Sequence, residues 1–106
     1  MKLITTSGAE YISKETHPIS GLIDWIRKDP STGELKESGR AIAIYPDRLP
    51  AVLASTSWKV ENGRMAGFNQ QGTRTCLLIQ GQVLPGMILM NPRSGLRSTR
   101  ITKVID

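Results

Sequence analysis

The chain has 106 residues, of which 39% are hydrophobic and 5% aromatic, and its formal net charge is +5. This length supports one domain with one modest core and is too short for two. The only cysteine, Cys76, excludes an internal disulfide, and the only histidine, His17, leaves too few ligands for a structural zinc site. The opening segment MKLITTSGAEYI contains too short an apolar run for a cleaved signal, and no window approaches the roughly 20 apolar residues of a transmembrane helix.

Residues 1–20 are polar and weakly patterned. That composition suits an irregular arm that becomes ordered by lying on a neighbouring protein. The alternative is an edge strand with a disordered lead. We therefore predict an arm or edge strand over residues 1–20 and a single β domain over residues 21–106.

The stretches GLIDWIRKD and RAIAIYP predict a hairpin whose polar tip, Asp29 to Gly39, projects into solvent. In the second stretch Ile42 and Ile44 lie on one face, and alternation places Ala41 and Ala43 on the other. The prolines of PDRLP then end the strand, and the following DRLPAVLAS is the only stretch with a pattern for a helical turn or two.

A second hairpin is predicted from AVLASTSWKV and GRMAGF, because Asn62 and Gly63 accept the positive φ of a tight type I′ turn. The expected pairing places Trp58 and Val60 across from Met65 and Ala66. The continuous apolar run from Cys76 to Ile79 is typical of a strand buried on both faces.

Two turns, PG and NPRSG, then bracket the short strand MILM, and LRSTRITKVI is the last predicted strand. Helical periodicity is nearly absent. We predict an all-β fold of about seven short strands, a small barrel or sandwich of SH3-like or OB-like size.

No residue pattern indicates catalysis. Cys76 lies in an apolar run, where burial raises the pKa of a thiol and makes it less reactive, and His17 precedes a proline in an expected exposed loop. The acids near the first hairpin lie in a solvated tip without the apolar wall that raises the pKa of a general acid. Neither a dinucleotide-binding nor a P-loop motif occurs. We expect no enzymatic activity, no metal and no cofactor.

Charge is unevenly distributed. Residues 1–61 carry eight basic and eight acidic side chains, so the net charge comes from residues 62–106, where six bases stand against Asp106. Arginine predominates among these six, and its planar guanidinium suits bidentate contact with carboxylate or phosphate. The predicted site for an anionic partner consists of Arg64, Arg74, Arg93, Arg97, Arg100 and Lys103.

The alternative interpretation is that these cations only solvate strands and protect exposed sheet edges. If LRSTRITKVI is one regular strand, Arg100 shares a face with Val104, whereas Arg97, Ile101 and Lys103 share the other. The bases are then divided between two faces. Between Asn69 and Asp106 there is no aromatic residue to stack on bases, which weighs against a single-stranded nucleic-acid binder.

The segment VLPGMILMNPRSGLRSTRITKV, Val83 to Val104, resembles a segment of small bacteriophage virion proteins, of the head decoration (cement) or head-to-tail connector type. The shared features are a Leu-Pro-Gly turn, a short strand and a tight hairpin. The resemblance implies a homo-oligomeric β module that docks onto other subunits of a virion assembled in the host cytoplasm. For a protein that is not part of a virion, we expect a cytoplasmic location.

Two functional hypotheses follow. The first is a non-enzymatic structural or interaction protein, a phage virion component that decorates a capsid or joins neck and tail. The alternative is a small basic β-barrel of phage or plasmid origin that binds nucleic acid. A small enzyme ranks third.

Overall fold

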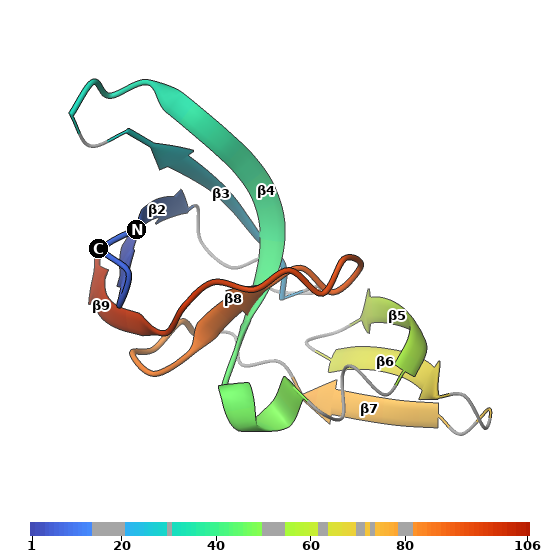
Figure 1. The fold of residues 1–106 in the computed structure, drawn as a ribbon. Helices are drawn as coiled ribbons and strands as arrows, with labels where there is room; N and C mark the ends of the chain where they lie inside the picture. The colour runs from blue at the N-terminus through green and yellow to red at the C-terminus, as the bar shows by residue number, and fades with distance from the viewer. Residues whose placement is uncertain are drawn as a thin grey trace.

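The computed structural model describes residues 1–13, 21–29, 31–49, 55–61, 64–69, 72, 74–78 and 82–106. Its larger sheet is antiparallel and has six strands in the order β8-β4-β3-β2-β1-β9 (Figure 1). The strands are β1 (Lys2–Thr5), β2 (Glu10–Ser13), β3 (Ile23–Lys28), β4 (Leu35–Ile44), β8 (Ile88–Met90) and β9 (Ile101–Ile105).

This sheet curls into a half-barrel. Its two edge strands are β8 and β9, and β8 is hydrogen-bonded to the segment that leads into β9. Backbone hydrogen bonds run from Ser98 N–H to the Leu89 carbonyl at 2.8 Å and from Ile101 N–H to the Met87 carbonyl at 2.7 Å. Residues 97–101 therefore lie beside β8 before they enter β9.

The interior of the half-barrel is one apolar cluster to which all six strands of this sheet or their flanks contribute. Its members alternate with outward-facing residues along each strand, as the pleat requires. They are Leu3, Tyr11, Ile23, Ala41, Ala43, Val83, Met87, Leu89 and Ile101.

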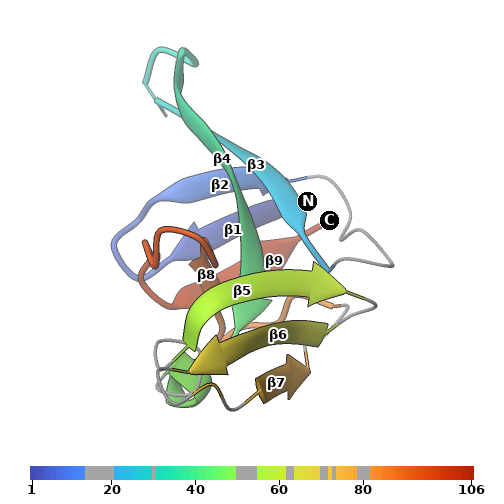
Figure 2. The same cartoon turned by 90° about the vertical axis from the view of Figure 1, so that its right-hand side faces the viewer.

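A smaller sheet of three strands lies against the outer side of β4 and β8 (Figure 2). It has the order β5-β6-β7, formed by β5 (Ser55–Glu61), β6 (Arg64–Asn69) and β7 (Arg74–Leu78). Met65 of β6 is fully buried in a second cluster with Ile42, Ile44, Leu49, Ile88 and Met90. Residues 41–44 of β4 and all of β8 are therefore buried on both faces, which explains their continuous apolar sequences, AIAI and ILM.

The all-β prediction is confirmed: apart from strands, the described elements include one 3-10 turn, η1 (Pro46–Arg48). Alternation in β4 also holds, since Ala41 and Ala43 belong to the inner cluster while Ile42 and Ile44 belong to the second. The tip of the first hairpin is shorter than predicted, because β4 already begins at Leu35.

The second hairpin has its predicted strands, and Val60 lies opposite Met65 as expected, but Trp58 lies opposite Gly67, one residue beyond the predicted Ala66. Its turn at Asn62 and Gly63 lies outside the described residues, as does His17. A strand does include Cys76, which pairs with Ala66, but the burial predicted for its side chain lies outside what the structure describes.

Residues 2–13 differ from the predicted irregular arm or edge strand. They form β1 and β2, which lie inside the sheet between β9 and β3. Leu3 and Thr5 point into the half-barrel and are 0% and 2% exposed. Four-residue strands carry only two inward side chains each, so their amphipathic pattern is too short to stand out in the sequence.

Candidate functional site

The six predicted cations are all exposed, and none forms an ion pair with an acidic residue in the described part of the chain. Two of them, Arg64 and Arg74, belong to the smaller sheet. Arg64 pairs with Leu78 at one end of β6 and β7, whereas Arg74 pairs with Phe68 at the other end. Four residues of strand separate these ends by about 13 Å. Arg64 and Arg74 therefore do not form a common site.

Cations in the amino-terminal half behave differently. Four of them lie within 4.0 Å of a carboxylate, in the pairs Lys2–Glu10, Arg27–Glu37, Lys36–Asp29 and Arg40–Asp24. The shortest, between Arg40 Nε and Asp24 Oδ1, measures 2.8 Å. Pairing within the fold thus accounts for four of the eight cations of residues 1–61, while Lys28 and Lys59 are exposed and form no ion pair among the described residues.

The other four predicted cations follow one continuous segment from the turn after β8 to β9, and we call Arg93, Arg97, Arg100 and Lys103 the basic edge. The turn that carries Arg93 is held by its own backbone. Asn91 Oδ1 accepts a hydrogen bond from Arg93 N–H at 2.8 Å, and Gly95 N–H donates to the Asn91 carbonyl at 2.9 Å. The backbone at this end of the basic edge is therefore ordered.

A bulge in β9 changes which residues share a face. Leu3 pairs with Val104 and Thr5 pairs with Ile101, so the register shifts by one residue and Thr102 is the extra one. Ile101 and Val104 consequently both face the interior, and Lys103 is exposed opposite Ile4. The prediction that Ile101 and Lys103 share a face is wrong.

The bulge also affects Arg100, which directly precedes the buried Ile101 and is exposed, as is Lys103. A regular strand would have directed two residues three apart to opposite faces. With the extra residue between them, Arg100 and Lys103 can lie on the solvent side together. The prediction that Arg100 and Lys103 lie on opposite faces is therefore wrong, because both are exposed.

Beside the basic edge lies a groove of about 390 Å³ at the mouth of the half-barrel, which we call the Trp25 groove. One wall is the hairpin β3–β4 and the other is residues 96–98. The side chains that matter for its chemistry are Tyr11, Trp25, Arg27, Glu37 and Arg97.

The indole of Trp25 is held in place from two sides. Tyr11 packs against it edge to face, with ring centroids 5.0 Å apart at 81°. Across the strand pair, Trp25 lies opposite Gly39. A Cβ at Gly39 would lie only 2.7 Å from Trp25 Cζ2, so the absent side chain makes room for the ring. The groove therefore has a preformed, half-buried aromatic wall.

Charge in the groove comes from both walls. Arg27 Nη1 donates to Glu37 Oε1 at 2.9 Å, so this pair is locally neutral. Arg97 has no such carboxylate among the described residues and supplies the uncompensated positive charge. The groove thus combines an aromatic surface with a single available guanidinium.

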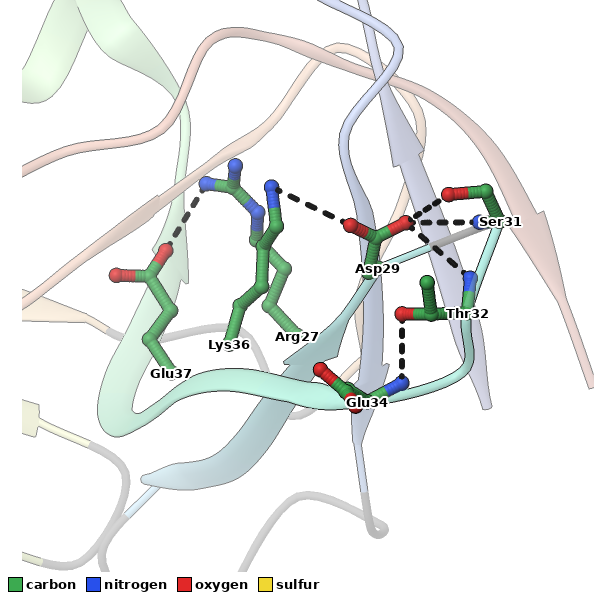
Figure 3. Close-up of polar contacts among 7 residues, drawn as sticks. All are labelled: Arg27, Asp29, Ser31, Thr32, Glu34, Lys36 and Glu37. Atoms are coloured by element: carbon green, nitrogen blue, oxygen red, sulfur yellow. Dashed lines mark hydrogen bonds and ion pairs between the residues drawn. The ribbon is translucent and has the colours of Figure 1, made fainter.

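The tip of the β3–β4 hairpin is a separate polar cluster (Figure 3). Asp29 Oδ1 accepts hydrogen bonds from the Ser31 hydroxyl at 2.6 Å and from Ser31 N–H at 2.8 Å. These two hydrogen bonds lower the pKa of the Asp29 carboxyl, and the bond from the Ser31 hydroxyl has the larger effect. Asp29 is therefore ionised at neutral pH and serves to order the turn.

Sequence reasoning identified Arg97 but missed Trp25 and Tyr11. Counting outward from the turn between Asp29 and Glu34 pairs Trp25 with Ser38, and the bulge between Arg27 and Lys28 shifts its partner to Gly39. The approach of Arg97 to this hairpin depends on long-range pairing and carries no local signal.

In the described part of the chain, no cluster of three or more His, Cys, Asp or Glu side chains is arranged to hold a metal ion. Among the same residues, no helix is long and apolar enough to span a membrane. Comparisons with family models, curated proteins and solved structures give no match to this chain.

Proposed function

We propose that this protein is a non-enzymatic interaction module that docks onto an acidic surface of a larger protein assembly through its basic edge. The observation that carries the proposal is the contrast in pairing. Lys2, Arg27, Lys36 and Arg40 have carboxylate partners, whereas all four cations of the basic edge are exposed without one in the described chain. Lys28 and Lys59 are also unpaired among the described residues, but they lie singly on separate strands.

Exposed ion pairs within a protein are worth little, so the paired cations offer a partner little new attraction. Exposed arginines on an ordered backbone are different, because their donors are still available for bidentate contact with carboxylates. Such charges steer association and fix register more than they add affinity. Binding should therefore weaken as salt increases.

The resemblance of Val83–Val104 to small phage virion proteins supports a more specific form of the proposal. In that form the assembly is a virion, the protein is a homo-oligomer that decorates a capsid or joins neck and tail, and assembly takes place in the host cytoplasm. Light scattering tests the oligomer, since a strictly monomeric particle contradicts this form.

The docking experiment compares two triple variants with the same change in net charge. One is Arg93→Glu, Arg100→Glu and Lys103→Glu on the basic edge. The other is Lys59→Glu, Arg64→Glu and Arg74→Glu on the smaller sheet, where all three side chains are exposed. The probe is poly-L-glutamate, and its binding is measured at low and moderate salt by isothermal titration.

We expect the basic-edge triple to weaken poly-L-glutamate binding at least tenfold more than the smaller-sheet triple. Equal losses in both triples would mean that only net charge attracts the probe, and the docking proposal would fail. Equal circular dichroism spectra of the two variants serve as the control for folding.

A second candidate function is binding of nucleic acid, and one observation favours it. The carboxy-terminal third lacks aromatic residues, yet the fold brings Trp25 and Tyr11 to the same groove as Arg97. Base stacking on an aromatic ring beside a cation is the usual arrangement in single-strand binders. Binding of oligothymidylate that falls on Arg97→Ala replacement, with a steep dependence on salt, is the expected signature.

A further inference from the structure

Strand β4 has an edge that its neighbours cover only in part. On one side, residues from Leu35 to Ala41 pair with β3. On the other side, β8 pairs only with Ile42, Ala43 and Ile44. The β8-side edge of residues 36–41 therefore has no strand partner among the described residues, and Figure 1 shows β4 continuing beyond β8 toward the hairpin tip.

Charged side chains commonly protect such an edge, but two of those on β4 are held toward β3, on the side away from the open edge. Arg40 is bound to Asp24 and Glu37 to Arg27, and both partners belong to β3. These ion pairs draw the charges toward β3 and away from the open edge. Charged side chains and short strands are the usual means of blocking further pairing, so the edge of β4 is unusually accessible.

The Trp25 groove runs along this same edge. Glu37 to Ala41 of β4 form one wall, and Leu96 to Ser98 form the other. A strand that occupied the groove would continue the line of β8, with its backbone in reach of the edge of β4. Its alternate side chains would point toward the interior of the half-barrel, where Trp25 lies.

We propose that the partner docks by β-strand addition: an extended peptide segment pairs with residues 36–41 of β4, places an apolar side chain against Trp25, and directs a carboxylate to Arg97. Main-chain hydrogen bonds supply affinity in this mode of recognition, and pockets for alternate side chains supply specificity. The inference rests on the proposed docking function and names the form of the partner.

The experiment uses the full chain with Trp58→Phe, which leaves Trp25 as the only tryptophan. An immobilised library of random octapeptides is screened for binding, and the enriched peptides are titrated while Trp25 fluorescence is recorded. Hydrogen exchange of the amides of residues 36–41 is measured with and without peptide. Three counterparts of each enriched peptide are prepared. Two are N-methylated at alternate residues, one at the odd and one at the even positions, and the third has its acid replaced by the amide.

We expect enriched peptides that alternate apolar and polar residues and contain an acid. They should change Trp25 fluorescence and protect amides between Lys36 and Ala41, and one of the two alternate N-methylation patterns should weaken binding at least tenfold. Arg97→Ala should weaken the acidic peptide about fivefold and the amide counterpart much less. The matched control Arg74→Ala, on β7 of the smaller sheet and outside the lining of the groove, should change neither.

Failure of this inference is distinguishable from failure of the docking function. If no peptide is enriched, or if enriched peptides leave the amides of residues 36–41 unprotected, strand addition is wrong, whatever the basic-edge triple does to poly-L-glutamate. If oligothymidylate alone changes Trp25 fluorescence, the groove is a nucleic-acid site and the peptide inference is likewise overturned.

Discussion

The contact between Trp25 and Gly39 makes a prediction that tests the geometry of the groove itself. Gly39 lies in β4 directly opposite Trp25. Replacement by alanine would place a Cβ 2.7 Å from Trp25 Cζ2 and 3.0 Å from Cε2. An indole is rigid and Tyr11 packs against it, so the ring has to move as a whole.

Two effects of Gly39→Ala oppose each other. Overpacking of this kind costs about 1–3 kcal/mol. Removing a glycine from a strand returns roughly 0.5–1 kcal/mol, because the unfolded chain loses freedom. The expected net loss of stability is therefore on the order of 1 kcal/mol, which lowers the Tm of a domain of this size by about 4–8 °C.

The assay is a double-mutant cycle followed by thermal and urea unfolding, with Trp25→Leu as the second change. With the indole absent, the alanine meets no ring, and Gly39→Ala should become neutral or stabilising by up to about 1 kcal/mol. The coupling between the two sites should then be roughly 1–3 kcal/mol. If Trp25→Leu does not fold, Trp25→Phe provides the milder background.

Additivity of the two changes would refute the reasoning, as would a stabilising effect of Gly39→Ala in the presence of Trp25. Either result would mean that the ring does not occupy the space above Gly39, and that the aromatic wall of the groove is not formed as described.

Three further predictions follow from other parts of the fold. Met65→Ala should lower the free energy of unfolding by about 2–5 kcal/mol, because this side chain is fully buried between the two sheets; urea unfolding measures it, and a loss below about 1 kcal/mol contradicts that packing. Ile101→Ala should cost about 2–5 kcal/mol against under roughly 1 kcal/mol for Ile105→Ala, since the first is buried and the second is 38% exposed. The lowered pKa of Asp29 means that its contribution to stability is present above the unfolded value of about 3.9 and is lost as pH falls through the folded pKa. NMR titration should give a carboxyl midpoint below that of an unfolded chain, and Ser31→Ala should raise it; equal midpoints argue against the Ser31 hydrogen bonds.

The sequence by itself determined the fold class and the local hairpins. Alternation in RAIAIYP predicts two faces for β4, and the structure buries Ala41 and Ala43 in one cluster and Ile42 and Ile44 in another. Strands close in sequence pair through short turns, so composition and turn residues are sufficient to locate them. The sequence also showed that the net positive charge lies in residues 62–106. In the structure, the ion pairs among the described residues all lie in residues 2–40.

Only the tertiary structure decided which distant strands meet. Leu3 pairs with Val104, and this contact between the two ends of the chain places residues 2–13 inside the sheet. The bulge at Thr102 then sets the directions of Ile101 and Lys103. Such pairing depends on the packing of the whole core, and no local pattern of four or five residues specifies it.

The same reason explains the candidate site. Trp25 and Arg97 are far apart in sequence and line one groove only because β8 and residues 97–101 complete the half-barrel beside the first hairpin. A residue type can indicate what a side chain is able to bind. Its neighbours across a curled sheet are set by strand order and register, which arise when the core is assembled.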